Sequence, residues 1–477
     1  MDLTITRQNF GAAVQETAAQ VLSLIRKSPT AFHAVQTAAE LLSAAGYTEL
    51  QENRPWRLEA GGRYFVTRNG SSVISFRIPG KDFRGYRIIA AHSDSPAFKI
   101  KENPEMKIPG FYVKLNTERY GGMLMNPWFD RPLSAAGRVV LRGGETRLVN
   151  IDRDLLMIPG LAIHMDREAN KGRELNPQKD LLPVFAGCVP CSSAGMASRP
   201  SSGVDAVSGP VPGAAAGNAS GAASGAGSGA EGFPSFMETV AAAAGCRADE
   251  ILTHDLFLYD RTPQSAWGAR GEFISSARLD DLECAFGLLL GFLSSGREGS
   301  AYVSMHAIFD NEEVGSMTKQ GADSTFLEDT LRRIGLALGR TEEQYYMAVA
   351  DSFMVSADNA HAVHPNFPEK ADPVNRPRMN GGIVLKYSAN QKYTTDAVSG
   401  AFIKEVCAAA GVPCQVFTNR SDMIGGSTLG NISGAHVSVR TADIGLAQLA
   451  MHSPYETAGA LDPEYLKRFA GAFYRSE

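Results

Sequence analysis

The sequence predicts an α/β sandwich, with helices on both faces of a mixed sheet, interrupted by an inserted domain that is mainly β. Three observations carry this prediction. Strand-like and helix-like segments alternate over residues 1–96 and again over 233–477, which is typical of α/β domains. Between them, residues 97–191 contain short alternating runs broken by Gly and Pro, a pattern that indicates β structure. At 477 residues the chain is also long enough for two domains.

The first α/β segment begins with two predicted helices between about Gln8 and Ala45, closed by a glycine. Three strand-like stretches follow, RYFVTR, SSVISFRI and YRIIAAH. The last of these ends at His92, with Asp94 two residues later and Pro96 soon after. Taken alone, this is a strand-end turn in which Asp94 bonds its own backbone and His92 is a satisfied polar residue.

A tract rich in Gly, Ala, Ser and Pro, residues 192–232, follows the predicted β domain. It offers few side chains to bury against the entropy of ordering, so we expect a flexible, dispensable loop. Cys188 and Cys191 form a CxxC just before it. A zinc site would need a second such pair, and a redox motif would need a helix start in a βαβ setting, so we interpret the pair as incidental.

The second α/β segment carries most of the remaining acids and histidines. LECAFGLLLGFLSS and AVSGAFIKEVCAAAG are predicted helices, and AYVSMHAIF, YYMAVA and AHVSVR are predicted strands. The polar residues at the boundaries of these elements are Asp280, Asp281, Asp310, Glu312, Glu313, Asp358, His361, His364 and His452. Because ligands of open α/β sheets gather beyond the carboxyl ends of the strands, one pocket could receive most of them.

A pocket with that many carboxylates would suffer repulsion and desolvation unless it held a cation. Mixed carboxylate and imidazole ligands suit zinc, cobalt or manganese, and two-metal hydrolytic sites hold their ions about 3.5–4 Å apart. Each residue also has a simpler explanation by itself. Asp280 could cap a helix, the Glu312–Glu313 pair could be a solvated turn, and His452 could be a polar residue on a helix face. Their joint position at element boundaries favours the metal site.

Composition excludes several other classes of function. A net charge of -5 gives no broad basic face for nucleic acid. The first residues carry charges among the apolar ones and lack the apolar run of a signal peptide, and no long uncharged segment could span a bilayer. We therefore expect a cytoplasmic protein with no membrane partner. No HExxH motif occurs, which disfavours a single-zinc protease of that kind.

Seven segments, in chain order, resemble the M18 family of metallo-aminopeptidases, which includes the aspartyl aminopeptidases. They are AAHSDSPAFKIK, WFDRPLSAAGRV, IPGLAIHMDRE, ARLDDL, DNEEVGS, SADNAHAVHPN and LAMHS. The resemblance spans most of the chain but leaves the tract 192–232 without a counterpart. It implies a catalytic domain formed by 1–96 and 233–477, an inserted dimerisation or oligomerisation domain at 97–191, and hydrolysis of peptides at a free N-terminus.

The resemblance also implies two divalent metal ions, zinc first, with cobalt or manganese as alternatives. The matching ligands are His92, Asp280, Glu313, Asp358 and His452. Asp280 matches the bridging position. His92 and Asp358 would complete one ion's protein shell, and the other two residues would complete the second.

Two acids receive catalytic roles. Glu312 matches the family's catalytic glutamate and would act as general base, taking a proton from the attacking water. Asp94 lies at i+2 from His92 in an extended segment, so both side chains project to the same side. We expect Asp94 to orient the imidazole of that histidine.

Three further residues concern substrate and assembly. Lys386 matches a family lysine associated with an acidic substrate side chain, with an exposed surface lysine as the alternative. His164 matches a histidine that reaches a neighbouring subunit's active site, which implies a homo-oligomer; similar members form tetrahedral dodecamers. His361 lies near Asp358 and could help bind substrate or make structural hydrogen bonds.

The leading hypothesis is thus a dinuclear exopeptidase that removes an N-terminal Asp or Glu. A metal-dependent amidase or deacylase with a different substrate is the alternative among hydrolases. A non-catalytic scaffold on the same fold is the alternative from another class, and it predicts damaged ligand positions.

Overall fold

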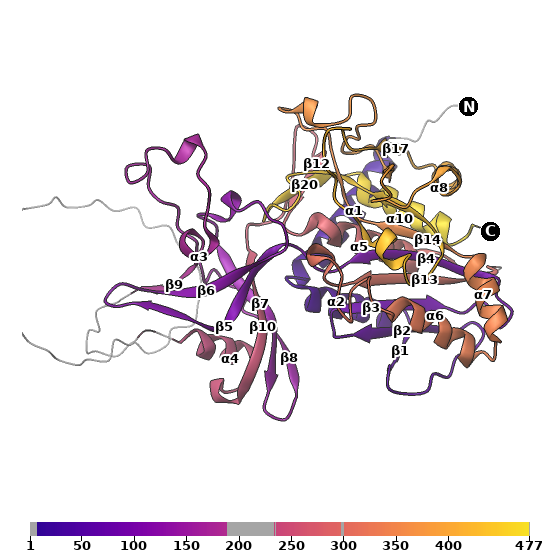
Figure 1. The fold of residues 1–477 in the computed structure, drawn as a ribbon, viewed down its shortest axis with the longest axis horizontal. Helices are drawn as coiled ribbons and strands as arrows, with labels where there is room; N and C mark the ends of the chain where they lie inside the picture. Colours follow the sequence, from indigo (N-terminus) through magenta and orange to yellow (C-terminus); the bar gives the residue numbers. More distant parts are fainter. Residues whose placement is uncertain (1–6, 188–232, 234, 297–299, 477) are drawn as a thin grey trace, which may run out of the picture.

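The computed structural model describes residues 7–187, 233, 235–296 and 300–476, with side chains from residue 16 onward. Two units lie side by side (Figure 1): a nine-stranded sheet covered by helices, and a six-stranded sheet with few helices. The predicted mixed α/β architecture is confirmed. The tract 192–232 and the CxxC pair Cys188 and Cys191 lie outside the described residues, so the predictions made for them stay predictions.

The nine-stranded sheet has the order β1-β2-β3-β13-β4-β14-β18-β16-β17. Its central strands β13, β4, β14 and β18 are mutually parallel, whereas β3 and β16 pair antiparallel with the outer two of these four. The strands are β1 (Thr48–Leu50), β2 (Arg63–Arg68), β3 (Ser72–Arg77), β4 (Gly85–His92), β13 (Tyr302–Phe309), β14 (Phe353–Ala357), β16 (Ile383–Lys386), β17 (Cys414–Phe417) and β18 (Arg440–Gly445). The four parallel strands therefore end at one common edge.

Helices cover both faces of this sheet (Figure 1). One face packs against α1 (Arg7–Lys27), α2 (Ala31–Ala44), α5 (Leu279–Ser294), α8 (Ala397–Ala410) and α10 (Asp462–Phe473), and the other against α6 (Phe326–Ala337), α7 (Glu342–Ala350) and α9 (Leu429–Ser433). Helix α5 is apolar nearly all round and buried along most of its length, as expected for a helix inside a core. A Cβ at Gly291 would come within 2.5 Å of Ala470, so this glycine allows α10 to approach α5 closely.

A smaller five-stranded sheet has the order β11-β12-β20-β19-β15. Its strands are β11 (Ser265–Trp267), β12 (Phe273–Ser276), β15 (Ala360–His361), β19 (Ala447–Leu449) and β20 (Glu456–Gly459). Strand β12 leads directly into α5, and the turn between β19 and β20 carries His452. This sheet consequently connects two segments that carry predicted ligands.

The six-stranded sheet has the order β8-β7-β10-β5-β6-β9. Its strands are β5 (Ala97–Ile108), β6 (Tyr112–Tyr120), β7 (Leu133–Leu141), β8 (Thr146–Asn150), β9 (Val184–Gly187) and β10 (Ile251–Asp260), accompanied by α3 (Pro177–Asp180) and α4 (Phe236–Ala244). Strand β10 pairs with both β7 and β5 in the middle of the sheet. The last strand of this sheet, β10, ends at Asp260. The sequence had predicted that the chain re-enters the α/β domain already at residue 233.

Two strand predictions are wrong. YYMAVA lies within helix α7, because Thr341 and Gln344 form a reciprocal capping box at its start and Glu, Gln, Met and Ala favour helix. All of AHVSVR except its last residue precedes the strand, because the backbone N–H groups of His436 and Val437 donate to the Ser433 carbonyl oxygen in a turn after α9. Strand β18 begins only at Arg440.

None of the helices in the described ranges combines the length and apolar character needed to cross a bilayer.

Candidate metal centre

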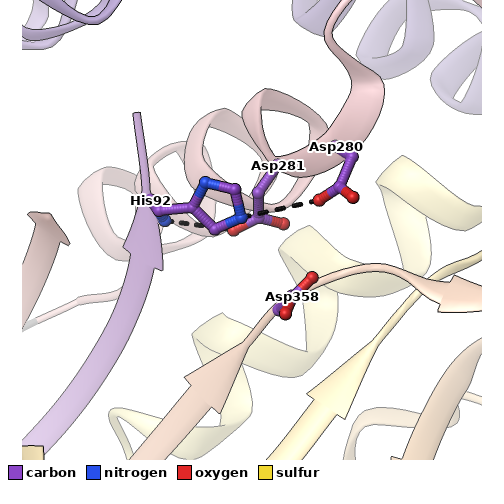
Figure 2. A group of neighbouring side chains, drawn as sticks. All are labelled: His92, Asp280, Asp281 and Asp358. Carbon is purple, nitrogen blue, oxygen red and sulfur yellow. Dashed lines mark hydrogen bonds and ion pairs between the residues drawn. The ribbon is translucent and has the colours of Figure 1, made fainter. Parts of the chain in front are cut away.

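All five predicted metal ligands meet at the carboxyl edge of the parallel strands. His92 ends β4, Asp358 follows β14, and Glu313 lies in the short 3-10 turn Glu312–Val314 after β13. Asp280 lies at the start of α5 and His452 in the β19–β20 turn. Figure 2 shows His92, Asp280 and Asp358 converging from three different elements. The strand order thus brings together residues that are far apart in sequence.

Asp280 lies between the two histidines. Its Oδ1 is 3.5 Å from His92 Nε2, and its Oδ2 is 3.4 Å from His452 Nε2. The same nitrogen of His452 is 3.3 Å from Glu313 Oε1. Donor atoms of Asp280, Glu313 and His452 form one group, and donor atoms of His92, Asp280, Asp281 and Asp358 form another, with all atoms of a group within 4.8 Å of one another.

These donors fit a divalent cation. Metal–ligand distances of about 2.0–2.2 Å in a tetrahedral zinc site place neighbouring ligand atoms roughly 3.3–3.5 Å apart, as seen between the imidazole nitrogens and carboxylate oxygens here. Asp280 Oδ1 and Glu313 Oε1 are buried and accept no hydrogen bond within the described protein. Buried carboxylate oxygens of this kind are costly unless an ion or a proton compensates them.

Without a metal ion, the surroundings of three of these carboxyl groups raise their pKa values above the ordinary range. Burial raises the pKa of Glu312 to about 9, of Glu313 to about 7 and of Asp358 to about 6. Burial opposes ionisation of Asp280 as well, but His452 and His92 lower its pKa strongly. A carboxylate must be ionised to ligate a metal or to act as general base, and a cation at this position would supply the compensating charge.

The backbone N–H groups of Glu312 and Glu313 both donate hydrogen bonds to the carboxylate of Asp94. Asp94 Oδ1 accepts from Glu312 N at 3.1 Å, and its Oδ2 accepts from Glu313 N at 3.2 Å. His92 Nδ1 is 3.4 Å from the Asp94 carboxylate but only 3.1 Å from the backbone oxygen of the same residue. Asp94 therefore fixes the turn that carries the two glutamates, and its main chain contributes to the orientation of the imidazole.

Lys386 lies beside the cluster and not on the surface. It is 2 % exposed, its Nζ donates to Asn359 O at 2.8 Å, and it lies 3.8 Å from Asp358 Oδ2. Burial lowers the pKa of Lys386, but the Asp358 carboxylate outweighs this effect and raises it. The structure excludes the alternative of an exposed surface lysine.

The remaining predicted residues differ in position. His361 is exposed on β15, three residues after Asp358, and its ring makes an edge contact with Phe417. His364 Nδ1 accepts from Asn366 N, a local turn contact. His164 lies apart from the cluster, in an exposed loop of the six-stranded unit whose apolar neighbours Ile163 and Met165 are also exposed.

Three residues near the site were not singled out from the sequence. Tyr120 ends β6 of the inserted sheet, and its hydroxyl donates to Asp94 Oδ2 at 2.7 Å. Asn359 is buried and donates through Nδ2 to Gln448 Oε1 and Leu279 O. Glu456 is buried beneath Asp280 and His452. Only Asn359 and Glu456 had a sequence signal, because they lie one and four residues after predicted ligands.

A cavity of about 430 Å³ lies on one side of Asp94, between the α/β unit and the six-stranded sheet. Its walls include Thr30, Tyr120, Arg138 and Asp310 and none of the five predicted ligands. The cavity is therefore adjacent to the site without containing it.

Comparison with known proteins identifies the fold and the family. Residues 24–474 match the family model "Aminopeptidase I zinc metalloprotease (M18)". The chain is 43% identical over 467 residues to "Probable M18 family aminopeptidase 2" of Clostridium acetobutylicum, covering 96% of this chain and 98% of that protein. It is 39% identical over 461 residues to the protein of the same name from Stutzerimonas stutzeri, covering 96% and 97%.

Solved structures of similar proteins have the same fold. The chain of a cryo-EM structure titled as the Ape4 and Nbr1 complex superposes with a TM-score of 0.86 at 32% identity, covering 100% of this chain and 88% of that one. The S. cerevisiae mApe1 dodecamer superposes with a TM-score of 0.77 at 26% identity, covering 97% of both chains. The chain belongs to the M18 family of zinc metalloproteases and is a metallo-aminopeptidase, as the sequence motifs predicted.

Proposed function

We propose that this aminopeptidase uses two divalent cations to remove an N-terminal Asp or Glu from peptides. The observation that carries the proposal is the position of Asp280, whose two carboxylate oxygens face His92 and His452 separately. A carboxylate placed in this way can bridge two ions. His92 and Asp358 would then complete the shell of one ion, and Glu313 and His452 that of the other.

The chain's own residues account for the remaining steps. Bound divalent cations would lower the pKa of a water molecule and polarise the scissile carbonyl. Glu312, which has an oxygen within 4.8 Å of donor atoms of His92 and Glu313, would take the proton from the attacking water and deliver it to the leaving amine. Asp94 holds both backbone amides of this pair, so it would keep the general base in position.

Lys386 supports the acidic substrate class. Its ammonium group is buried beside Asp358, so a substrate carboxylate entering there would meet a desolvated positive charge. Such pairing favours acidic side chains and penalises neutral or basic ones. An amidase or deacylase of different specificity would have no need of this lysine, and a scaffold would have no need of an intact ligand set.

Assembly is part of the proposal. The mApe1 structure is titled as a dodecamer, and the loop that carries His164 exposes Leu161, Ile163 and Met165 at 50, 48 and 75%. Contiguous exposed apolar residues are typical of interaction sites. We propose a homo-oligomer, of up to twelve subunits, in which His164 reaches the active site of a neighbouring subunit.

The test is a panel of aminoacyl anilides with Asp, Glu, Leu, Lys and N-acetylated Asp, assayed after chelation and after zinc, cobalt or manganese is returned. We expect cleavage of the Asp and Glu substrates only, lost with chelation and restored with metal. Equal cleavage of the N-acetylated substrate would contradict the exopeptidase assignment, and a preference for Leu would contradict the role of Lys386.

A further inference from the structure

A buried acid outside the ligand set, Glu456, contacts two of the proposed ligands at once. Glu456 is 2 % exposed, and its Oε1 accepts from the backbone N–H of His452 at 2.7 Å. Its Oε2 accepts from the backbone N–H of Asp280 at 3.0 Å. Because its two oxygens hold the backbone N–H groups of two different segments, one side chain fixes the distance between two ligand-bearing segments.

The backbone at both segments needs such support. His452 has a φ of +65°, in the left-handed region that disfavours a non-glycine residue. Asp280 has non-helical backbone angles at the first turn of α5, and the preceding Arg278 also has a positive φ. Neither segment is fixed in this conformation by regular secondary structure, so the carboxylate of Glu456 is a principal restraint on the two ligands.

Glu456 is itself rigidly held. It is the first residue of β20 and pairs with Ser276 at the end of β12. Strand β12 continues into α5 and Asp280, and His452 lies in the turn before β20. The five-stranded sheet thus places this carboxylate midway between the segments that carry the two ligands.

We propose that Glu456 is a positioning residue for the metal centre, setting the separation of Asp280 and His452 and hence the affinity for the second ion. The inference rests on the proposed two-metal function. Glu456 would thus play the same part as Asp94, which accepts from the backbone amides of Glu312 and Glu313 on the other side of the site.

The chain provides a matched control in Asp462. This acid is also fully buried, and it also accepts from two backbone N–H groups, those of Asn380 at 2.6 Å and Gly382 at 2.9 Å. Neither donor belongs to a proposed ligand. Replacement of Asp462 therefore removes the same type of restraint without disturbing the metal centre.

The experiment measures zinc affinity by competition with a chromophoric chelator, and the absorption spectrum of the cobalt-loaded protein, for the parent, Glu456→Gln and Asp462→Asn. A glutamine keeps one acceptor but turns its NH2 group toward the other backbone N–H, so one restraint is lost. We expect Glu456→Gln to bind the second ion 10–100-fold more weakly, with an altered cobalt spectrum. Asp462→Asn should bind both ions as the parent does.

Parent-like affinity for both ions in Glu456→Gln would overturn the proposal. Glu456→Asp, which keeps the charge on a shorter side chain, should show a smaller loss of affinity. If both variants at this position fail to fold with zinc in excess while Asp462→Asn folds, Glu456 is required by the fold itself and the proposal is wrong. Failure of the proposed function would instead appear in the parent protein, as absent cleavage of acidic substrates or a single ion per chain.

Discussion

The acidic residues of the two units are compensated in different ways. In the six-stranded sheet, Asp255 lies 2.9 Å from both Lys99 and Arg138, and Asp260 lies 2.8 Å from Arg131. At the edge of the nine-stranded sheet, Asp280 and Glu313 lie 3.3–3.5 Å from histidine nitrogens, and one buried oxygen of each accepts no hydrogen bond from the described residues. The acids of the first unit are paired with lysine and arginine side chains, whereas those of the second form a group of donors that fits a divalent cation.

The largest effect should come from Glu312→Gln. Loss of the general base should lower kcat by roughly 10²–10⁴-fold, while zinc content and the KM for an Asp substrate stay near the parent values. Activity assays and elemental analysis on the same preparation check this. A variant that loses zinc would show instead that Glu312 is a ligand.

The matched control for Glu312→Gln lies in the other unit. Asp255→Asn also removes one carboxylate charge, but from a partly exposed pair, where ion pairs contribute at most about 1 kcal/mol. We expect its turnover to stay within about twofold of the parent. A loss comparable to that of Glu312→Gln would erase the distinction between the two units.

Lys386→Met should have the next largest effect. It removes the buried ammonium but keeps most of the side-chain length, so kcat/KM for an Asp anilide should fall by roughly 10–100-fold, the equivalent of one charged hydrogen bond of about 1.5–3 kcal/mol. The Leu anilide should be affected much less. Lys99→Met, which removes one of the two partners of Asp255, is the control and should change kcat/KM for neither substrate. An equal fall for both substrates in Lys386→Met would contradict the specificity role.

The smallest effect should be seen in the pH dependence of stability. Burial raises the pKa of Asp462 to about 7, so between pH 4 and 7 the folded state binds more protons there than the unfolded state. Stability from this group is present at low pH and is lost as pH rises toward 7. The melting temperature of the parent relative to Asp462→Asn should therefore fall by a few degrees from pH 5 to 8 in zinc.

The contribution of Asp255 to stability, by contrast, should not change between pH 5 and 8. Burial opposes its ionisation, but Lys99 and Arg138 lower its pKa, so both its folded and unfolded pKa values lie below 5. Its contribution is present above that range and constant from pH 5 to 8. The melting temperature of Asp255→Asn should differ from the parent by the same amount across these pH values. If the melting temperature of Asp462→Asn also differed from that of the parent by the same amount at every pH, the pKa of about 7 for Asp462 would be contradicted.

The sequence was sufficient to predict the fold class, from hydrophobic patterning, and the gathering of acids and histidines in one place, from their positions at element boundaries. The choice of five of them as proposed ligands came from the resemblance to the M18 family. It was insufficient for YYMAVA, because a capping box at Thr341 outweighed the β-like composition. It also missed the contacts of Glu456, four residues after His452, with the backbone N–H groups of His452 and of the distant Asp280. No pattern in a single sequence records such contacts.

Tyr120 had no sequence signal at all, because its contact depends on how the two units pack. Its hydroxyl, carried by a strand of the six-stranded sheet, donates to Asp94 and accepts from Asn311 at 2.8 Å. A Cβ on the next residue, Gly121, would lie 3.2 Å from Glu313, so the same strand end also lies against the catalytic turn. An isolated α/β fragment would keep every ligand and still lack this support. We therefore expect turnover to depend on the packing of the two units, even where every proposed metal ligand is retained.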